Sequence, residues 1–211
     1  MTEQLITDGR TKRAEAQRES RRAHILWTAL EVFAKNGYHQ TRVSDILDAA
    51  GIARGTFYLY FESKSAIFLE LLDSLLTQLR DTVVGVETGP DAPPVKDQLL
   101  ATVTNVVRVV EDHQLLAQII LREAVGLDED VDQKLNEFYG NLRRFISESL
   151  QNGQRMGIVR PDLDTDIVAA CILGSIKYIL EQYVMHSQDE PFDAHRVGRA
   201  VLDYNLRGVL G

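Results

Sequence analysis

The placement of glycine and proline is the feature that most restricts how this chain can fold. The 211 residues include 14 Gly and 5 Pro, and these residues separate long segments in which apolar side chains recur at positions i, i+3, i+4 and i+7. No segment shows the alternation of apolar and polar residues that is typical of a strand. The sequence therefore predicts an all-α fold of about nine helices, four before a loop at residues 85–94 and five after it.

The first 65 residues predict a long helix followed by two short ones. Neither Gly nor Pro interrupts residues 11–36, and Gly37 stops this helix. Thr41 is the expected N-cap of a second helix that ends at Gly51. A third helix is expected to run through Tyr60. The two short helices, joined by a glycine turn, form a helix-turn-helix candidate.

Charge differs between the two parts of the chain. The net charge is −8 in total, but residues 1–65 carry ten basic and eight acidic side chains, whereas residues 66–211 carry 13 and 23. We therefore predict a mildly basic N-terminal domain at residues 1–65 and an acidic helical C-terminal domain at residues 66–211.

Basic side chains are concentrated at the start of the chain. They are Arg10, Lys12, Arg13, Arg18, Arg21 and Arg22. Such a segment attracts phosphate backbones by releasing condensed counterions, but a solvated tail has the same composition, and both interpretations stay open. Whether this segment is a separate arm or a continuation of the first helix, we expect it to contribute affinity for DNA more than sequence specificity.

Aromatic residues crowd the stretch GIARGTFYLYFESKSAIF at residues 51–68. Phe57 and Phe61 are four positions apart, so they lie on one face of a helix and are expected to face the core. Tyr58 and Tyr60 then project elsewhere and leave their hydroxyls outside. A hydrophobic core alone does not explain these two tyrosines.

Polar groups beside these tyrosines suit recognition of DNA. Arg54 and Thr56 are hydrogen-bonding residues at the start of the same helix, and Gly55 removes a side chain where a DNA backbone can approach. Lys64 follows the expected N-cap Ser63 and adds a cation near N-terminal N–H groups that favour anions. The pattern predicts a phosphate clamp around a recognition helix, with an ordinary amphipathic helix as the alternative.

Three segments closely resemble the DNA-binding domain of TetR-family transcriptional regulators. They are TRVSDI at 41–46, AAGI at 49–52 and GTFYLYFESK at 55–64, and the resemblance extends over residues 20–68. It implies a three-helix DNA-binding domain, with helix-turn-helix, and a larger helical domain. It also implies a sequence-specific, homodimeric repressor that a small-molecule effector releases from its double-stranded DNA operator.

The resemblance also implies roles for individual residues. Backbone phosphates are contacted by Thr41, Tyr58, Tyr60 and Lys64. Positions that approach phosphates or bases are Arg42, Ser44, Arg54, Gly55 and Thr56. Two residues depart from the family pattern, because Ala53 lacks the hydroxyl of a frequent serine and Leu59 replaces a polar residue or histidine. Some family members send an N-terminal extension toward a minor groove, which is the alternative to a longer first helix.

For the C-terminal domain, the resemblance implies effector binding and dimerisation without naming the ligand. Candidate contacts for an apolar or amphipathic effector are His113, Leu116, Ile120, Phe138, Tyr139, Leu142 and Tyr178. Candidate dimer-interface residues are Cys171, Ile172, Ser175, Ile179, Val197 and Val201. An intramolecular core is the alternative in both cases. Arg122, Arg143 and Arg144 keep an anionic effector such as an acyl thioester open.

No motif has the spacing of a catalytic or metal site. The five histidines lack H-E-x-x-H spacing, no phosphate-binding loop is present, and Cys171 has no nucleophile signature. We expect no enzyme activity, no metal and no cofactor. No signal-like segment opens the sequence and no apolar run reaches roughly 20 residues, so we expect a cytoplasmic protein outside the membrane. The alternatives to a ligand-responsive repressor are an architectural or occlusion factor without an effector, and an all-α enzyme.

Overall fold

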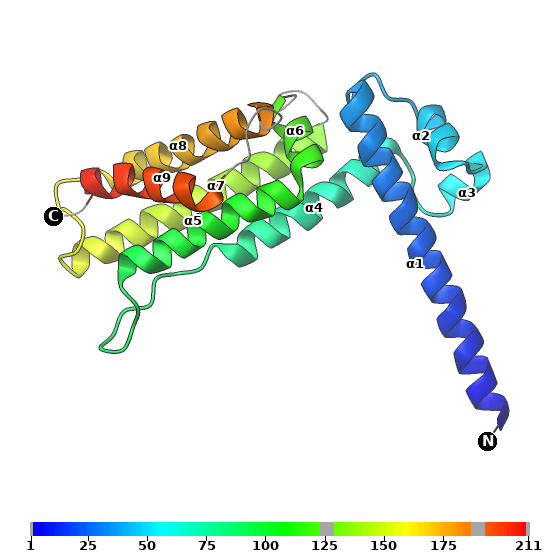
Figure 1. The fold of residues 1–211 in the computed structure, drawn as a ribbon, viewed down its shortest axis with the longest axis horizontal. Helices are drawn as coiled ribbons and strands as arrows, with labels where there is room; N and C mark the ends of the chain where they lie inside the picture. The colour runs from blue at the N-terminus through cyan, green and yellow to red at the C-terminus, as the bar shows by residue number, and fades with distance from the viewer. Residues whose placement is uncertain (1, 123–128, 187–192, 210–211) are drawn as a thin grey trace. The chain divides into compact units, whose positions relative to one another are not determined.

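The structure is a computed structural model that describes residues 2–122, 129–186 and 193–209 (Figure 1). Over these ranges its regular elements are nine α-helices, which confirms the all-α prediction. The chain divides into two compact units, Met1–Leu72 and Asp73–Gly211. The division falls inside α4, Lys64–Thr82. It does not test which unit carries which function, so the roles predicted for residues 1–65 and 66–211 stay predictions.

The first helix, α1, runs over Thr2–Asn36 and ends at Gly37, whose φ of 83° lies in the left-handed region. It begins well before residue 11, so the basic segment is an extension of the first helix. The C-terminal half of α1 is anchored by Ile25, Ala29 and Phe33, which are fully buried. These side chains are four residues apart and therefore share one face of the helix.

The second helix, α2, covers Val43–Ala50, and its N-cap is Arg42. The prediction that Thr41 caps this helix is therefore wrong. A carboxylate oxygen of Asp45 accepts a 2.7 Å hydrogen bond from the Arg42 backbone N–H, and this bond satisfies a donor at the start of the helix. The Thr41 hydroxyl instead donates to the Gly37 carbonyl at 2.7 Å.

The third helix, α3, follows a glycine turn and is short. Gly51 has a φ of 63° and ends α2 as predicted. Helix α3 covers only Arg54–Tyr58, so the prediction that it runs through Tyr60 is wrong. Its N-cap Ala53 offers no side-chain acceptor, as the missing hydroxyl implied. Before α4, the Oγ of Ser63 accepts a 3.0 Å bond from the backbone N–H three residues further on, as predicted.

Aromatic side chains form the interior of the first unit. The ring centroids of Phe33 and Tyr38 are 5.3 Å apart, and those of Tyr38 and Phe68 are 4.9 Å apart. Phe57 and Phe61, with centroids 6.2 Å apart, are also buried. Helices as short as α2 and α3 are marginal on their own, so this interior is what holds them in place.

The second unit combines the C-terminal part of α4 with five further helices, as the periodicity predicts. They are α5 (Val95–Asp112), α6 (Gln114–Arg122), α7 (Glu129–Arg155), α8 (Thr165–His186) and α9 (Ala194–Val209). Helix α7 lies beside α8, and α5 lies beside α9 (Figure 1). Gly198 permits the second close approach, because a Cβ at this position would lie 3.2 Å from Thr104 Oγ1 of α5.

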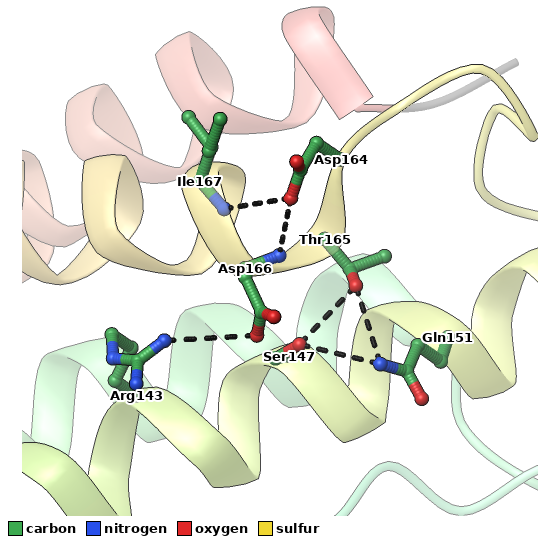
Figure 2. A network of polar contacts seen from close by, with 7 residues as sticks. All are labelled: Arg143, Ser147, Gln151, Asp164, Thr165, Asp166 and Ile167. Carbon is green, nitrogen blue, oxygen red and sulfur yellow. Dashed lines mark hydrogen bonds and ion pairs between the residues drawn. The ribbon is translucent and has the colours of Figure 1, made fainter.

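A polar network joins α7 to the start of α8 (Figure 2). Ser147 Oγ donates to Thr165 Oγ1 at 3.2 Å, and Gln151 Nε2 donates to the same oxygen at 3.3 Å. Ser147 is only 3% exposed, so its hydroxyl needs a partner inside the protein. Asp164 accepts bonds of 3.0 and 3.1 Å from two backbone N–H groups in the first turn of α8. The network fixes the start of α8 against α7.

Candidate functional site

The α3 surface is the first candidate site. We define it as Arg54, Gly55, Thr56, Tyr58, Leu59 and Tyr60. Phe57 and Phe61 anchor it from behind, with 0% and 4% of their surface exposed, whereas Tyr58 is 47% and Leu59 73% exposed. Arg54 and Gly55 are exposed, and Thr56 and Tyr60 are half-buried. The two phenylalanines are thus buried and Arg54 and Tyr58 face outward, as the spacing predicts, whereas Thr56 and Tyr60 are only partly exposed.

Arg54 is oriented by its aromatic neighbour. Its Cζ lies 5.8 Å from the centroid of the Tyr58 ring, a cation–π arrangement that leaves guanidinium donors available. Arginine donors can bind guanine edges or phosphates, tyrosine hydroxyls can donate to phosphates, and the exposed Leu59 can contact a thymine methyl. This combination of groups suits duplex DNA.

The start of α2 adds two exposed side chains and one buried one. Arg42 and Ser44 are exposed, but Thr41 is only 2% exposed. The Thr41 backbone N–H and hydroxyl both donate to the Gly37 carbonyl, at 3.2 and 2.7 Å. Thr41 therefore closes the turn before α2 instead of facing outward, and the geometry does not support its predicted phosphate contact.

Lys64 also acts inside the first unit. Its Nζ donates to the backbone carbonyls of Tyr38, His39 and Thr41 at 2.7, 3.3 and 2.9 Å. It also lies 4.5 Å from the centroid of the Tyr38 ring. The ammonium group thus holds the turn between α1 and α2 in place. This arrangement corrects the expectation that Lys64 presents its charge to phosphates.

Arg22 is a structural residue that the sequence patterns missed. Its two terminal guanidinium nitrogens donate to both carboxylate oxygens of Glu70 in α4. The Arg22 Cζ also lies 4.9 Å from the centroid of the Phe61 ring. Arg22 therefore ties α1 to α4 and to Phe61, which anchors the α3 surface from behind. Its place in a basic segment gave no sign of this role.

The second candidate site is an apolar cavity of about 100 Å³ in the second unit. Helices α4, α5, α6, α7 and α8 all contribute to its lining. The lining residues are Leu75, Leu76, Leu79, Val83, Val106, Val110, Ala117, Ile120, Leu121, Leu135, Phe138, Tyr139, Leu142, Leu173, Ile176, Lys177 and Leu180. Four predicted effector contacts are among them: Ile120, Phe138, Tyr139 and Leu142.

The other predicted effector contacts lie elsewhere. Leu116 is buried at 1% exposed but does not line the cavity. His113 Nε2 lies 3.1 Å from Gln78 Oε1, and Tyr178 is 62% exposed. These three residues stay predictions as effector contacts, because helical spacing places a residue on a face without identifying what that face meets.

Lys177 supplies the charge at the cavity, and the sequence analysis missed it. Its Nζ lies 5.0 Å from the centroid of the Tyr139 ring. Burial, and then the negative charge of Glu181, raise the pKa of the Tyr139 hydroxyl, so Tyr139 stays a neutral hydrogen-bonding group. Neither Arg143, which pairs with Asp166 at 3.6 Å (Figure 2), nor Arg144 lines the cavity. The Arg122 side chain is outside the described part of the structure.

The candidate dimer residues divide into two groups. On α8, Cys171 is exposed and Ile172, Ser175 and Ile179 are half-buried. On α9, Val201 is only 6% exposed and Val197 is half-buried. Helix α9 packs against α5 within one subunit, and Gly198, which follows Val197, faces Thr104 of α5. The prediction that Val201 is free to meet a second subunit is therefore not supported.

Large apolar side chains remain exposed on these two helices. Ile167 and Tyr178 of α8 are each 62% exposed, and Tyr204 of α9 is 77% exposed. A groove of about 660 Å³ runs between the helices, and its lining includes Cys171 and Tyr204.

Helix α8 contains a long apolar segment. By length and composition alone, Thr165–Val184 could cross a membrane, with a mean hydropathy of 1.4, and 11% of this segment is buried. This segment contains Asp166, Lys177 and Glu181, so it is not an uninterrupted apolar run, and a single helix of this kind is weak evidence for a membrane span.

Ionisable side chains form no metal cluster in the parts of the chain that the structure describes. No group of three or more His, Cys, Asp or Glu side chains there is arranged to hold a metal ion. The groups brought together by the fold are instead a surface of hydrogen-bond donors on α3 and an apolar cavity. These features suit binding, and neither contains a nucleophile beside a base.

Two family models match the chain. The model of bacterial regulatory proteins of the tetR family matches residues 25–71, which include α2, α3 and the start of α4. The model of the tetracyclin repressor-like C-terminal domain matches residues 92–209. The second match alone covers more than half of the chain.

Named relatives agree with these matches. The chain is 30% identical over 202 residues to the HTH-type transcriptional repressor KstR2 of Mycobacterium tuberculosis (strain CDC 1551 / Oshkosh), covering 93% of this chain and 96% of that repressor. It is 28% identical over 196 residues to the fatty acid metabolism regulator protein of Bacillus subtilis (strain 168), covering 92% and 97%. The crystal structure of FadR from Bacillus subtilis in complex with stearoyl-CoA has a TM-score of 0.66 at 26% identity, covering 88% and 98%. The chain therefore belongs to the tetR family of bacterial regulatory proteins and is a transcriptional repressor of that type.

Proposed function

We propose that this repressor binds its operator through the α3 surface and leaves it when an amphipathic effector enters the cavity. The observation that carries the DNA-binding part is the opposite exposure of two neighbours, because Phe57 is fully buried and Tyr58 is 47% exposed. Arg54, Gly55 and Thr56 meet bases or the backbone, Tyr58 and Tyr60 meet phosphates, and Arg42 and Ser44 add contacts from α2. Thr41 and Lys64 position these groups from within.

The DNA contact is tested by removing one hydroxyl. Tyr58→Phe keeps the ring beside Arg54 and loses one hydrogen bond to a charged phosphate, which is expected to weaken binding by about 10-fold or more. The loss should be equal for an operator duplex recovered from genomic fragments and for an unrelated duplex, since phosphates carry no sequence information. Fluorescence anisotropy measures both affinities. Unchanged affinity for both duplexes would contradict the proposed contact.

The cavity supports an effector with an apolar chain and an anionic group. Its lining is aliphatic and aromatic apart from Lys177 and Tyr139, and Lys177 can pair with a carboxylate or phosphate. The similarity to a fatty acid metabolism regulator and to a structure that contains stearoyl-CoA favours a fatty acyl thioester. A volume of about 100 Å³ is below the roughly 300 Å³ of small-ligand sites, so the effector must widen the cavity.

The proposed response passes through α4. Leu75, Leu76 and Leu79 of this helix line the cavity, and the same helix begins at Lys64 in the first unit. An effector that separates the lining side chains therefore shifts α4. An effector changes DNA affinity only by its differential affinity for the two states, and typical coupling amounts to about 1–3 kcal/mol.

The effector proposal is tested with two phenylalanines of α7. Phe138 lines the cavity, whereas Phe145 is 37% exposed and does not. Phe138→Trp reduces the space and is expected to raise the stearoyl-CoA concentration that releases operator DNA, and Phe145→Trp is the matched control. If stearoyl-CoA and shorter acyl thioesters release no DNA from the unmodified protein, the small cavity favours the second candidate function, an occlusion factor without an effector.

A homodimer formed through α8 and α9 accounts for the exposed apolar side chains of these helices. Ile167, Cys171, Tyr178 and Tyr204 are exposed in one subunit, and burial of such side chains against a second copy is favourable. We further propose that the protein is cytoplasmic and has no enzyme activity. The dimer interface then accounts for the apolar composition of α8 without a membrane. Cys171→Arg is expected to give monomers in size-exclusion chromatography. Glu148→Arg, at an exposed position of α7, is the control and should leave the dimer intact.

A further inference from the structure

Two ion pairs hold α4, and each of them comes from a different unit. Glu70 pairs with Arg22 of α1 in the first unit, and Asp73 pairs with Lys134 of α7 in the second unit. The two carboxylates are three positions apart, which is about 4.5 Å along the helix at 1.5 Å per residue. The division between the units falls between them. A movement of α4 at Asp73 therefore begins next to the residue that Arg22 holds.

The Asp73–Lys134 pair joins two helices that line the apolar cavity. On α4, Leu75 and Leu76 line the cavity and follow Asp73 by two and three positions. On α7, the lining residue Leu135 directly follows Lys134. The pair therefore connects the two helices close to the side chains that an effector has to separate.

Side chains, more than close backbone packing, hold α4 in the second unit. Among the described residues, the extensively packed helix pairs of this unit are formed by α5 to α9, and α4 belongs to none of them. The leucines of α4 border a cavity of about 100 Å³. Apolar side chains that border an empty space have fewer partner atoms. A charged link to α7 therefore contributes a larger share to the position of α4.

We propose that the Asp73–Lys134 pair is a latch that keeps the cavity narrow in the DNA-bound state and that the effector has to open. This inference rests on the proposed release of DNA by an effector. The cavity is smaller than an ordinary small-ligand site, so an effector enters only when the α4 lining separates from the α7 lining. This separation lengthens the pair. The pair thus stabilises the narrow state selectively, as a group must do to bias an equilibrium between two states.

The size of the effect follows from the exposure of the two side chains. The side chain of Lys134 is 33% exposed and that of Asp73 is 58% exposed, and a pair at such a site changes an equilibrium by up to about fivefold. The apparent affinity for an effector is proportional to the fraction of protein with an open cavity. Loss of the latch is therefore expected to strengthen effector binding by about two- to fivefold. DNA affinity without effector should stay nearly the same, because the narrow state still predominates.

Removal and exchange of the two charges test the latch. Lys134→Gln and Asp73→Asn each remove one partner, and Asp73→Lys/Lys134→Asp exchanges the charges. Each full-length protein is bound to the operator duplex and titrated with stearoyl-CoA. Both single variants are expected to release DNA at an about two- to fivefold lower concentration, and the exchanged pair should restore the original concentration. The single variants change the net charge in opposite directions, so an effect that they share does not come from net charge.

A second ion pair supplies the matched control. Lys96 of α5 pairs with Asp203 of α9 at 2.7 Å, and neither residue lines the cavity. Lys96→Gln changes the net charge as Lys134→Gln does and should leave the release concentration unchanged. If the unmodified chain releases DNA and Lys134→Gln needs the same or a higher concentration of stearoyl-CoA, the latch is wrong while the proposed release stands.

Hydrogen exchange provides a readout that needs no effector. In the unliganded proteins, the backbone amides of residues 73–82 in α4 should exchange faster in Lys134→Gln than in the unmodified chain, because the latch opposes local opening. The amides of α9 should not change. If stearoyl-CoA and shorter acyl thioesters release no DNA from any of these proteins, the effector proposal fails. Faster exchange in α4 of Lys134→Gln then still supports the latch, and unchanged exchange overturns it.

Discussion

The two units of this protein place their proposed binding groups in different ways. In the first unit, a helix of five residues holds both an anchor and a contact, since the buried Phe57 is adjacent to the exposed Tyr58. In the second unit, the cavity is lined by side chains from widely separated segments, from Leu75 to Leu180. One short stretch builds the first site, whereas the packing of several helices builds the second.

This difference follows from the chemistry of the two proposed ligands, duplex DNA and an apolar effector. DNA presents the same phosphates and base edges everywhere, so a small set of donors at a fixed spacing can meet it. An apolar effector is bound mainly by shape and burial, which many combinations of side chains can supply. Substitutions should therefore act sharply in the first unit and more weakly at the cavity.

The largest expected effect compares the same substitution in both units. Phe57→Ala empties a fully buried site and is expected to destabilise the first unit by about 3–5 kcal/mol. Phe138→Ala should cost less, because Phe138 is half-buried and already borders a cavity. Urea unfolding is followed by the fluorescence of Trp27, the one tryptophan of the chain, and by circular dichroism. Equal losses would break the comparison.

A second pair separates positioning from contact within the first unit. Lys64→Met removes the donor to three carbonyls and is expected to lower the free energy of unfolding by about 1–3 kcal/mol. Tyr58→Ala should weaken DNA binding and leave stability within about 0.5 kcal/mol, because Tyr58 is largely at the surface. Thermal unfolding and DNA affinity are measured for both. A Lys64→Met protein of unchanged stability would return Lys64 to the candidate DNA contacts.

A third prediction concerns a polar bond in the second unit. The Tyr183 hydroxyl donates to Glu111 Oε1 at 3.0 Å, and Tyr183→Phe is expected to cost about 1 kcal/mol. Burial, together with this bond and the charge of Glu111, raises the pKa of Tyr183 to about 12. The folded state favours the neutral phenol, so its contribution is complete below pH 10.0 and is lost toward pH 12.

The prediction for Tyr183 is tested by urea unfolding at several pH values across this range. Between about pH 9 and pH 11.5, the stability of the unmodified protein should fall more than that of Tyr183→Phe. Parallel losses in the two proteins would show that the phenol does not contribute to the pH dependence.

The smallest expected effect restores a cap. Ala53→Ser supplies an acceptor at the N-cap of α3, where φ is −72° and ψ is 151°, and should stabilise the first unit by about 0.5 kcal/mol. Ala53→Gly is the control without a hydroxyl. Chemical denaturation followed by Trp27 fluorescence detects the change. A loss of stability for Ala53→Ser would mean that the side chain cannot reach the free N–H groups.

Helix ends were predictable where one residue type decides the backbone. Gly37 and Gly51 adopt φ values of 83° and 63°, which other residues rarely adopt, and their positions predicted the ends of α1 and α2. Thr41 was misassigned because a hydroxyl can cap a helix or close the turn before it. The nearby carboxylate of Asp45 decided between these roles by accepting the Arg42 N–H.

Partners of helix faces were less predictable. The spacing of Val197 and Val201 shows that one face of α9 is apolar, but Val201 is already buried within one subunit, in which α9 packs against α5. Tyr204 of α9 is exposed, and the sequence patterns did not identify it as a candidate interface residue. Periodicity reports that a face is buried without naming the neighbour that buries it.

Local preferences alone determined the helical fold, the glycine stops and the inward and outward sides of α3, because these depend on backbone sterics and on 3.6 residues per turn. The tertiary structure decided that Lys64 binds the turn carbonyls, that Arg22 pairs with Glu70 and that Lys177 borders the cavity. Long charged side chains reach partners that are distant in the sequence, so their roles depend on how the helices pack.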